Sequence, residues 1–167
     1  IACALAHRPE VLIMDEPTVG VDPQSRSHIL EFIKDLAHAG TTIIYSTHYM
    51  EEVEQICSRI AIMDKGKIIA SGTKKELKES ISLGETIKIK CNGDFENKIK
   101  KVQEINNFIS MQTEDDQITV KFAKNPDNLK NMLDFLNKND IEYTSIYSEL
   151  PTLNDVFLEI TGKELRD

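Results

Sequence analysis

Blocks of apolar and polar residues divide the first half of the chain into short predicted elements. Residues 11–15 (VLIMD) are an apolar run that ends in an acid, which is typical of a strand buried on both faces of a parallel sheet. Asp22 and Pro23 then predict a helix start over an apolar stripe, with Gly40 as its stop. The stripe consists of Ile29, Phe32, Ile33 and Leu36. Residues 41–47 (TTIIYST) predict the next strand.

The remaining elements of this half follow at short intervals. The pattern predicts a helix at 49–57, a hairpin of strands 59–64 and 67–71 around Lys65-Gly66, and a charged helix capped by Thr73. Residues 1–8 have the pattern of a helix end that Pro9 stops. Because the chain starts inside this pattern and with Ile1, we expect it to be part of a longer protein.

The pattern changes after Gly84. Strands are predicted at 86–91, 105–112, 117–122 and 141–147, and helices at 94–103, 126–138 and 153–161. The order βαββαβ with a terminal helix matches the split βαβ, ferredoxin-like arrangement. The expected fold is therefore α/β, with a parallel-sheet portion over residues 1–84 and a small α+β accessory domain over 85–167.

Composition narrows the class of protein. A length of 167 residues with 40% hydrophobic side chains allows one ordinary domain or two small ones. The net charge of −8 gives no electrostatic support for a nucleic-acid partner. No apolar run reaches the roughly 18 residues of a membrane span, so we expect no direct membrane insertion. Cys3, Cys57 and Cys91 are too widely spaced for a zinc site and indicate buried or inert thiols of a reducing compartment.

Three titratable side chains are predicted to meet at one edge of the first sheet. Asp15 and Glu16 end one strand, and His48 follows the next one. The carboxyl ends of parallel strands share an edge, where open α/β sheets bind ligands. Alternation along the chain points the two acids in different directions, so that one can hold Mg²⁺ through water and the other can activate a water. His48 could donate to a transferring phosphoryl group.

Each of these residues also has a purely structural interpretation. Asp15 is a common kind of polar residue at a strand end, Asp22 is a good helix N-cap, and His48 could be an ordinary loop histidine. The run Glu51-Glu52-Glu54 is interpreted as a solvated helix face. It is the joint occurrence of Asp15, Glu16 and His48 that favours a catalytic site.

The order of these motifs resembles the ATP-binding subunit of ABC transporters, in the second half of its nucleotide-binding domain. VLIMDEP resembles the Walker B segment, VGVD (residues 19–22) the D-loop, and STH, with its histidine at position 48, the switch region. The resemblance implies that Asp15 is associated with Mg²⁺, Glu16 is the general base and His48 contacts the γ-phosphate of ATP. It also implies that Asp22 lies in a loop that reaches across a dimer to the nucleotide.

The second half resembles the C-terminal extension of the branch that exports drugs, antibiotics or lipids, most clearly in LNDVFLEITGK (residues 153–163). The implied partners are a separate transmembrane permease and a second ABC ATPase subunit, identical or different. The implied location is the cytoplasmic, inner face of the cell membrane. The extension is interpreted as a stabilising appendage, with a regulatory or dimer-contact module as the alternative.

The phosphate-binding half of such a site does not occur in this sequence. No Gly-Lys pair completes G-x-x-x-x-G-K-[ST], and there is no LSGGQ-type signature. The 167 residues alone are therefore expected to be inactive. Two alternatives remain: a non-transport ABC ATPase, and a non-catalytic regulatory or binding fragment.

Overall fold

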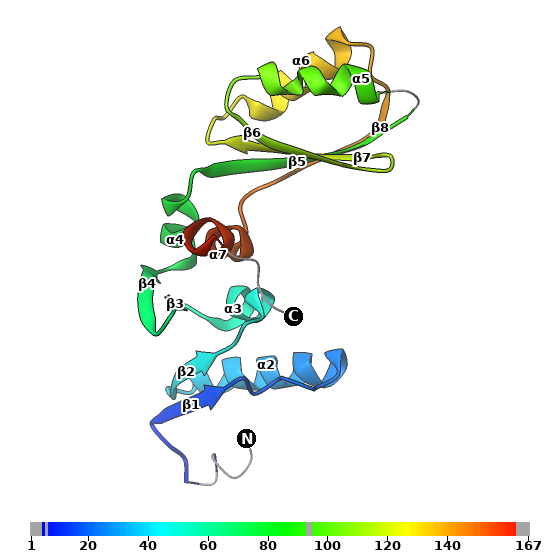
Figure 1. Cartoon of the computed structure of the whole chain (residues 1–167). Coiled ribbons are helices and arrows are strands. Elements are labelled where there is room, and N and C mark those ends of the chain that lie inside the picture. Colours follow the sequence, from blue (N-terminus) through cyan, green and yellow to red (C-terminus); the bar gives the residue numbers. More distant parts are fainter. Residues whose placement is uncertain (1–4, 6, 93–94, 163–167) are drawn as a thin grey trace. The chain divides into compact units, whose positions relative to one another are not determined.

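The computed structural model describes residues 5, 7–92 and 95–162, and the chain divides into two compact units between Leu77 and Lys78 (Figure 1). Most of the helix end predicted at residues 1–8 lies outside the described residues, as does Cys3. The first unit contains β1 (Val11–Asp15), α2 (Pro23–His38), β2 (Thr42–Ser46), α3 (Met50–Ile56), β3 (Ile60–Asp64) and β4 (Lys67–Gly72), and α4 (Lys74–Ser80) crosses the division.

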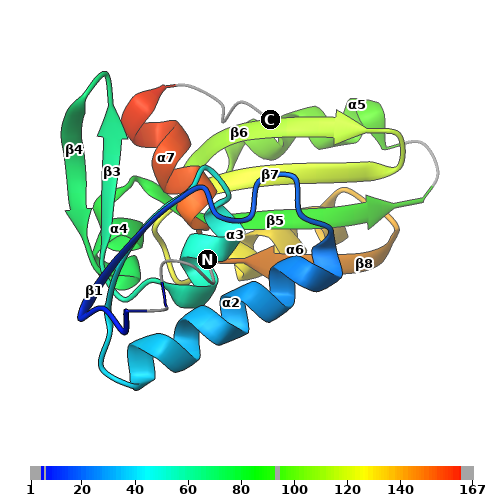
Figure 2. The ribbon, with the colours of Figure 1, turned by 90° about the horizontal axis from the view of Figure 1, so that it is seen from below.

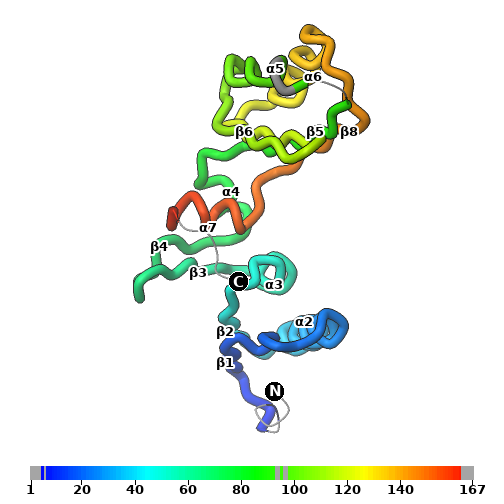
Figure 3. Tube along the Cα trace, turned by 45° about the vertical axis from the view of Figure 1, so that its right-hand side comes forward, coloured from blue at the N-terminus to red at the C-terminus, as the bar shows by residue number. Residues whose placement is uncertain are grey.

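The two strands of the predicted βαβ unit pair in parallel. Their register places Val11 opposite Thr42 and Asp15 opposite Ser46. Leu12 and Met14 pack with Ile33 of α2 on one face of this sheet. On the other face Val11 is 54% and Ile13 is 71% exposed. The prediction of burial on both faces is therefore wrong for the described structure, because α2 covers only one face (Figure 3).

Helix α2 begins and ends where the sequence predicts. Asp22 is its N-cap, and Gly40 lies just beyond its end with a φ of 103° that favours glycine. The amide of Gly40 donates to the carbonyl of Ala37 at 3.1 Å. The predicted apolar stripe is correct except for Phe32, which is 43% exposed, while Leu30 takes a buried place beside Ile33.

Strands β3 and β4 form the predicted hairpin. Lys65 and Gly66 both have positive φ values, 49° and 73°, as a tight two-residue turn of this kind requires. Thr73 then starts α4, because its hydroxyl accepts from the amide of Glu76 while its own amide donates to the Glu76 carboxylate at 2.8 Å. The backbone and side-chain hydrogen bonds from Thr73 lower the pKa of Glu76.

The second unit is a four-stranded antiparallel sheet with helices. Its strands β6, β7, β5 and β8 lie side by side in that order, and every neighbouring pair is antiparallel (Figure 2). The elements are β5 (Leu83–Cys91), α5 (Glu96–Ile99), a 3₁₀ turn (Lys100–Glu104), β6 (Phe108–Glu114), β7 (Gln117–Ala123), α6 (Asn128–Lys138), β8 (Tyr143–Glu149) and α7 (Leu153–Thr161). Helices α5 and α6 cover one face, and the core between sheet and helices includes Ile87, Val120 and Met132 (Figure 1).

The predicted order of strands and helices is present, with shifted bounds. The strand predicted at 105–112 starts only at Phe108, because Ile105 to Asn107 form a turn in which Asn107 has a φ of 68°. The helix predicted at 94–103 is a short α-helix that continues as a 3₁₀ turn, and residue 94 lies outside the described part. Within the residues that the structure covers, no helix combines the length and apolarity that crossing a membrane requires.

Gly84, the expected boundary, lies inside β5, whose bounds reach back to Leu83. A Cβ at position 84 would lie 2.4 Å from the Cα of Lys124, so a side chain does not fit there. The carboxylate of Glu159 in α7 accepts from the amides of Ser82 at 2.6 Å and Leu83 at 3.4 Å. Although burial alone would raise the pKa of Glu159, these hydrogen bonds lower it. Residues before Gly84 therefore contribute to the second unit.

We predict that a fragment of residues 78–162 is more stable than a fragment of residues 85–162. The shorter fragment loses the buried side chain of Leu83 and the two amides that Glu159 binds, which together stabilise by about 2–4 kcal/mol. Urea denaturation followed by circular dichroism measures the difference. Equal stabilities of the two fragments would place the boundary at Gly84. The variant Glu159→Gln in the longer fragment measures the contribution of the Glu159 carboxylate separately.

Candidate functional site

The carboxyl ends of β1 and β2 lie side by side because the two strands are parallel and in register. Asp15 is the last residue of β1 and is paired with Ser46, the last residue of β2. The amide of the next residue, Glu16, donates to the carbonyl of Ser46 at 3.0 Å, so the pairing continues one residue beyond the strand. His48 follows two residues after β2. The backbone thus brings Asp15, Glu16 and His48 to one edge of the sheet, as the sequence predicts.

The two acids have different partners at this edge. The carboxylate of Glu16 lies 3.1 Å from Nδ1 of His48, and these side chains are 49% and 33% exposed. The carboxylate of Asp15 accepts a short hydrogen bond from the hydroxyl of Ser46. Glu16 and His48 therefore form a solvent-accessible acid–imidazole pair, and Asp15 lies next to it in the chain but is bound separately.

Glu16 has an unusual backbone conformation. Its φ is +44°, in the left-handed region that residues with side chains rarely adopt. The chain turns immediately after it: the amide of Val19 donates to the Glu16 carbonyl at 3.2 Å, and that of Val21 to the Thr18 carbonyl at 3.1 Å. The strained residue is therefore the one at which the chain leaves β1, with its side chain toward His48.

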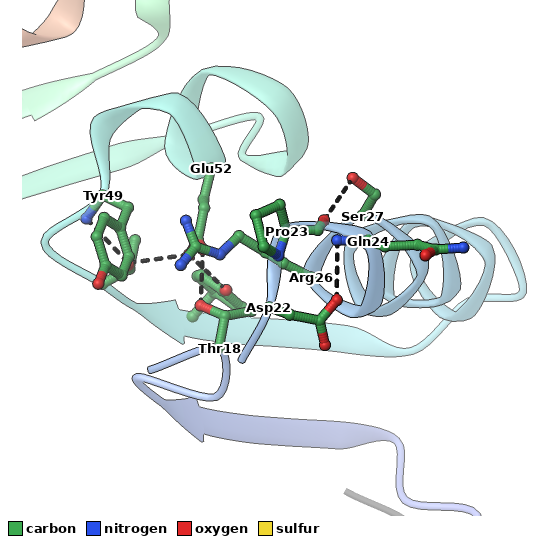
Figure 4. A network of polar contacts seen from close by, with 10 residues as sticks. Thr18, Asp22, Pro23, Gln24, Arg26, Ser27, Tyr49 and Glu52 are labelled. Atoms are coloured by element: carbon green, nitrogen blue, oxygen red, sulfur yellow. Dashed lines mark hydrogen bonds and ion pairs between the residues drawn. The ribbon is translucent and has the colours of Figure 1, made fainter. Parts of the chain in front are cut away.

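Asp22 lies at the end of the same loop but faces α2. Its carboxylate accepts from the amide of Gln24 at 3.1 Å (Figure 4). It also accepts from the amide of Ser25 at 3.0 Å. The bonds from Ser25 are the main reason why the pKa of Asp22 is lowered. The structure thus gives Asp22 the N-cap role, and its carboxylate contacts the first turn of α2 rather than the Glu16–His48 pair.

Glu52 is buried, and its interpretation as part of a solvated helix face is wrong. Its residue exposure is 2%, and three hydroxyl groups donate to its carboxylate. They belong to Thr18 at 2.6 Å, Tyr45 at 2.7 Å and Thr47 at 3.0 Å. The available sequence signal was the spacing of Tyr45 and Thr47, because two-residue alternation in the predicted strand 41–47 points both side chains the same way. That spacing does not identify the partner, because nothing in YMEEVEQIC marks Glu52 as more buried than Glu51.

One further side chain, that of Arg26, lies close to this carboxylate. Nε of Arg26 in α2 lies 3.7 Å from Glu52, an ion pair beyond hydrogen-bonding distance, and the guanidinium stacks 4.5 Å over the ring of Tyr49 (Figure 4). Burial raises the pKa of Tyr45 well above its ordinary value, and the neighbouring Glu52 carboxylate adds to the rise. Burial likewise raises the pKa of the Cys57 thiol, which fits the expectation of an inert cysteine.

The described residues contain no cluster of three or more His, Cys, Asp or Glu side chains that could enclose a metal ion. Asp15 and Ser46 offer only hard oxygen atoms, which suit a cation held partly by water. Glu16 and His48 can therefore position a water and a phosphate oxygen between them. The carboxylate of the neighbouring Asp15 has the Ser46 hydroxyl as its partner instead.

Comparison with known proteins gives two family matches. Residues 72–161 match the family described as "ATP-binding protein DrrA1-3-like, C-terminal domain". Residues 1–54 match the family described as "AAA domain, putative AbiEii toxin, Type IV TA system". The C-terminal match begins at residue 72, inside the range 1–84 that the sequence pattern assigns to the first half.

Individual relatives cover the whole chain. It is 40% identical to the linearmycin resistance ATP-binding protein LnrL of Bacillus subtilis, over 100% of this chain and 54% of that protein. It is 34% identical to the Nod factor export ATP-binding protein I of Cupriavidus metallidurans, over 100% of this chain and 52% of that protein. It is 31% identical to the daunorubicin/doxorubicin resistance ATP-binding protein DrrA of Streptomyces peucetius, over 100% of this chain and 51% of that protein. The chain spans about half the length of the curated relatives that it matches.

We predict that Asp22→Ala lowers the thermal midpoint of unfolding by a few degrees, whereas Asp22→Asn keeps it near the wild-type value. Asparagine can still accept from the amides of Gln24 and Ser25, and alanine cannot. Because the pKa of Asp22 is lowered by folding, its contribution is present above the unfolded pKa and is lost as the pH falls through the folded value. Circular dichroism between pH 2 and pH 7 tests this. Identical midpoints for all three proteins would contradict the N-cap role.

Proposed function

The chain belongs to the ATP-binding proteins of ABC transporters, in the DrrA-like export branch, and on that premise we propose that it is part of a subunit that hydrolyses ATP to power export. The subunit would act through a separate transmembrane permease, paired with a second ATP-binding subunit, on the cytoplasmic face of the membrane. The observation that carries the proposal is the 3.1 Å contact between Glu16 and His48 at the carboxyl edge of a parallel sheet.

Glu16 is proposed as the general base. Its carboxylate is half exposed and is held toward His48, so a water could approach it from the solvent side. It can orient that water and accept its proton as the phosphoryl group is transferred. The left-handed backbone at Glu16 supports a functional role, because strain of this kind is concentrated at active sites.

His48 is proposed to contact the γ-phosphate. Since Nδ1 faces the Glu16 carboxylate, Nε2 on the opposite side of the ring is the nitrogen left to face a phosphate oxygen. Imidazole at this distance also keeps the Glu16 carboxylate in one orientation. The pair would thus hold the attacking water on one side and the phosphate on the other.

Asp15 is proposed to hold Mg²⁺ through a bound water. The atoms at the end of the strand suit this ion, because the Asp15 carboxylate and its partner, the Ser46 hydroxyl, provide oxygen ligands. Mg²⁺ retains several waters when few carboxylates are available. When bound, the ion would neutralise charge on the phosphates. Asp22 is proposed to lie in the loop that reaches the nucleotide across a dimer, and its two bonds to α2 would stiffen that loop.

The phosphate cradle and the signature sequence must come from outside these 167 residues, because neither motif occurs in them. We therefore propose that the chain alone does not hydrolyse ATP. For the second unit we propose the ferredoxin-like arrangement and the role of an accessory domain that stabilises the subunit. The strand order β6-β7-β5-β8 with antiparallel neighbours supports that arrangement.

In a complete ATP-binding subunit that contains this sequence, we predict that Glu16→Gln abolishes steady-state ATP hydrolysis and spares ATP binding. Glutamine keeps the size of the side chain but cannot accept a proton from water, and loss of a general base costs about 10²–10⁴-fold. Phosphate release and nucleotide-binding assays measure the two properties. Normal turnover in this variant would refute the role of Glu16, and Glu51→Gln on the exposed side of α3 is the matched control.

His48→Ala is predicted to lower turnover strongly in the same protein, by about 10²-fold or more. The variant removes both the phosphate contact and the side chain that orients Glu16. The same assays, with ATP affinity measured separately, test this. An unchanged kcat would refute the role proposed for His48.

A further inference from the structure

The carboxylate of Glu52 joins four segments of the first unit. Its hydroxyl partners come from the loop after β1 (Thr18), from β2 (Tyr45) and from the residue before His48 (Thr47), and Arg26 of α2 provides the ion pair. Thr18 is itself fully buried at 0% exposure. Burying a carboxylate is costly unless donors surround it, and here three hydroxyl donors and a cation do so.

These segments carry the two residues of the acid–imidazole pair. Thr18 lies two residues after Glu16, inside the turn in which the amide of Val19 binds the Glu16 carbonyl. On the other side, the hydroxyl of Thr47 donates to Glu52 and accepts from the amide of Tyr49 at 3.0 Å. The residue between Thr47 and Tyr49 is His48. One buried carboxylate therefore fixes the loop of Glu16 and both neighbours of His48.

The ring of Tyr49 is held from two further directions. Arg26, the cation beside Glu52, stacks over it, and the ring of His48 lies 4.2 Å from it between centroids. We define the Glu52 cluster as Thr18, Arg26, Tyr45, Thr47 and Glu52. The His48 side chain thus packs against Tyr49, whose position depends on this cluster.

We propose that Glu52 is a positioning residue that sets the distance and orientation between Glu16 and His48. It touches neither of these side chains and acts through Thr18 and Thr47. The proposal rests on the proposed ATPase function. Glu16 and His48 are exposed, so only a reaction at this edge of the sheet requires their relative position to be fixed. A displacement of about 1 Å at such a pair can cost roughly 10²-fold in rate.

A purely structural role for Glu52 makes a different prediction. Loss of core stability alone would reduce the amount of folded protein and leave the kcat of the folded fraction unchanged. A positioning role lowers the kcat of folded protein with little change in the KM for ATP, because Glu16 and His48 act on the reacting water and γ-phosphate rather than on the nucleotide as a whole. The ratio of kcat to KM effects therefore separates the two roles.

The test uses Thr47→Val and Thr47→Ser in a complete ATP-binding subunit that contains this sequence. Valine keeps the volume of threonine and removes the hydroxyl, whereas serine keeps the hydroxyl. We expect Thr47→Val to lower kcat by about 10- to 100-fold with KM within about 3-fold, and Thr47→Ser to retain most of the wild-type kcat. Thr18→Val and Thr18→Ser repeat the comparison on the Glu16 side.

Glu52→Gln is the direct variant, with Glu51→Gln as its control on the exposed side of the same helix. Glutamine keeps one acceptor oxygen and replaces the other by a donor, so we expect a kcat loss of the size given for Thr47→Val. Amide hydrogen exchange in peptides that cover residues 15–22 and 46–50 should quicken in Glu52→Gln and stay unchanged in Glu51→Gln. If Glu52→Gln fails to fold, the threonine pairs still decide the question.

Equal kcat values for the valine and serine variants, or a wild-type kcat in Glu52→Gln, would overturn the proposal. The outcome for Glu16→Gln keeps the two hypotheses apart. If Glu16→Gln is inactive while the Glu52 and threonine variants turn over normally, the positioning role fails and the ATPase function stands. If Glu16→Gln is fully active, the proposed function is refuted, and the positioning role that rests on it is refuted with it.

Discussion

The parallel pairing of β1 with β2 is the interaction on which the candidate site depends. Its register places Asp15 opposite Ser46, and the hydrogen bond from Glu16 to the Ser46 carbonyl extends the pairing into the loops. A shift of one residue would turn every side chain of β1 to the other face. Leu12 and Met14 would then leave the core that they form with Ile33, so the apolar contacts that stabilise the sheet also fix its chemistry.

Polar contacts complete what the apolar core begins. Behind the exposed edge, the hydroxyls that converge on Glu52 come from β2 (Tyr45) and from the loops after β1 and β2 (Thr18 and Thr47), so they tie these loops to the strand. Since a carboxylate buried with fewer donors would destabilise the fold, each member of the cluster contributes to keeping the Glu52 carboxylate buried. This gives the loops after β1 and β2 a single common arrangement although Glu16, Val19 and Asp22 are exposed.

Much of the fold could be predicted from local signals, and the rest depends on contacts distant in sequence. The bounds of β1 and α7 agree with the sequence pattern, and Asp22, Gly40 and the turn at Lys65-Gly66 act as their chemistry indicates. Burial was harder to predict: Val11 and Ile13 are as apolar as any core residue but face outward, because what covers a strand is not encoded in the strand.

The candidate site shows the same division. Asp15, Glu16 and His48 could be placed on one edge by topology alone, since the carboxyl ends of parallel strands coincide. The partner of each acid, and the burial of Glu52, required the register and the loop conformations. A charged residue among other charges on a short helix gives no local sign that three hydroxyl groups will surround it, one of them from Thr18, 34 residues earlier in the chain.

The left-handed backbone at Glu16 has a consequence for how this position can change. A residue with a side chain pays roughly 1–2 kcal/mol for that conformation, whereas glycine adopts it freely. Selection for thermal stability alone would therefore drive position 16 toward glycine and remove the carboxylate. If glutamate is retained at this position, selection has favoured its chemistry over the stability that glycine would give. A comparison of natural variants at position 16 would therefore indicate which of them are still selected for catalytic activity.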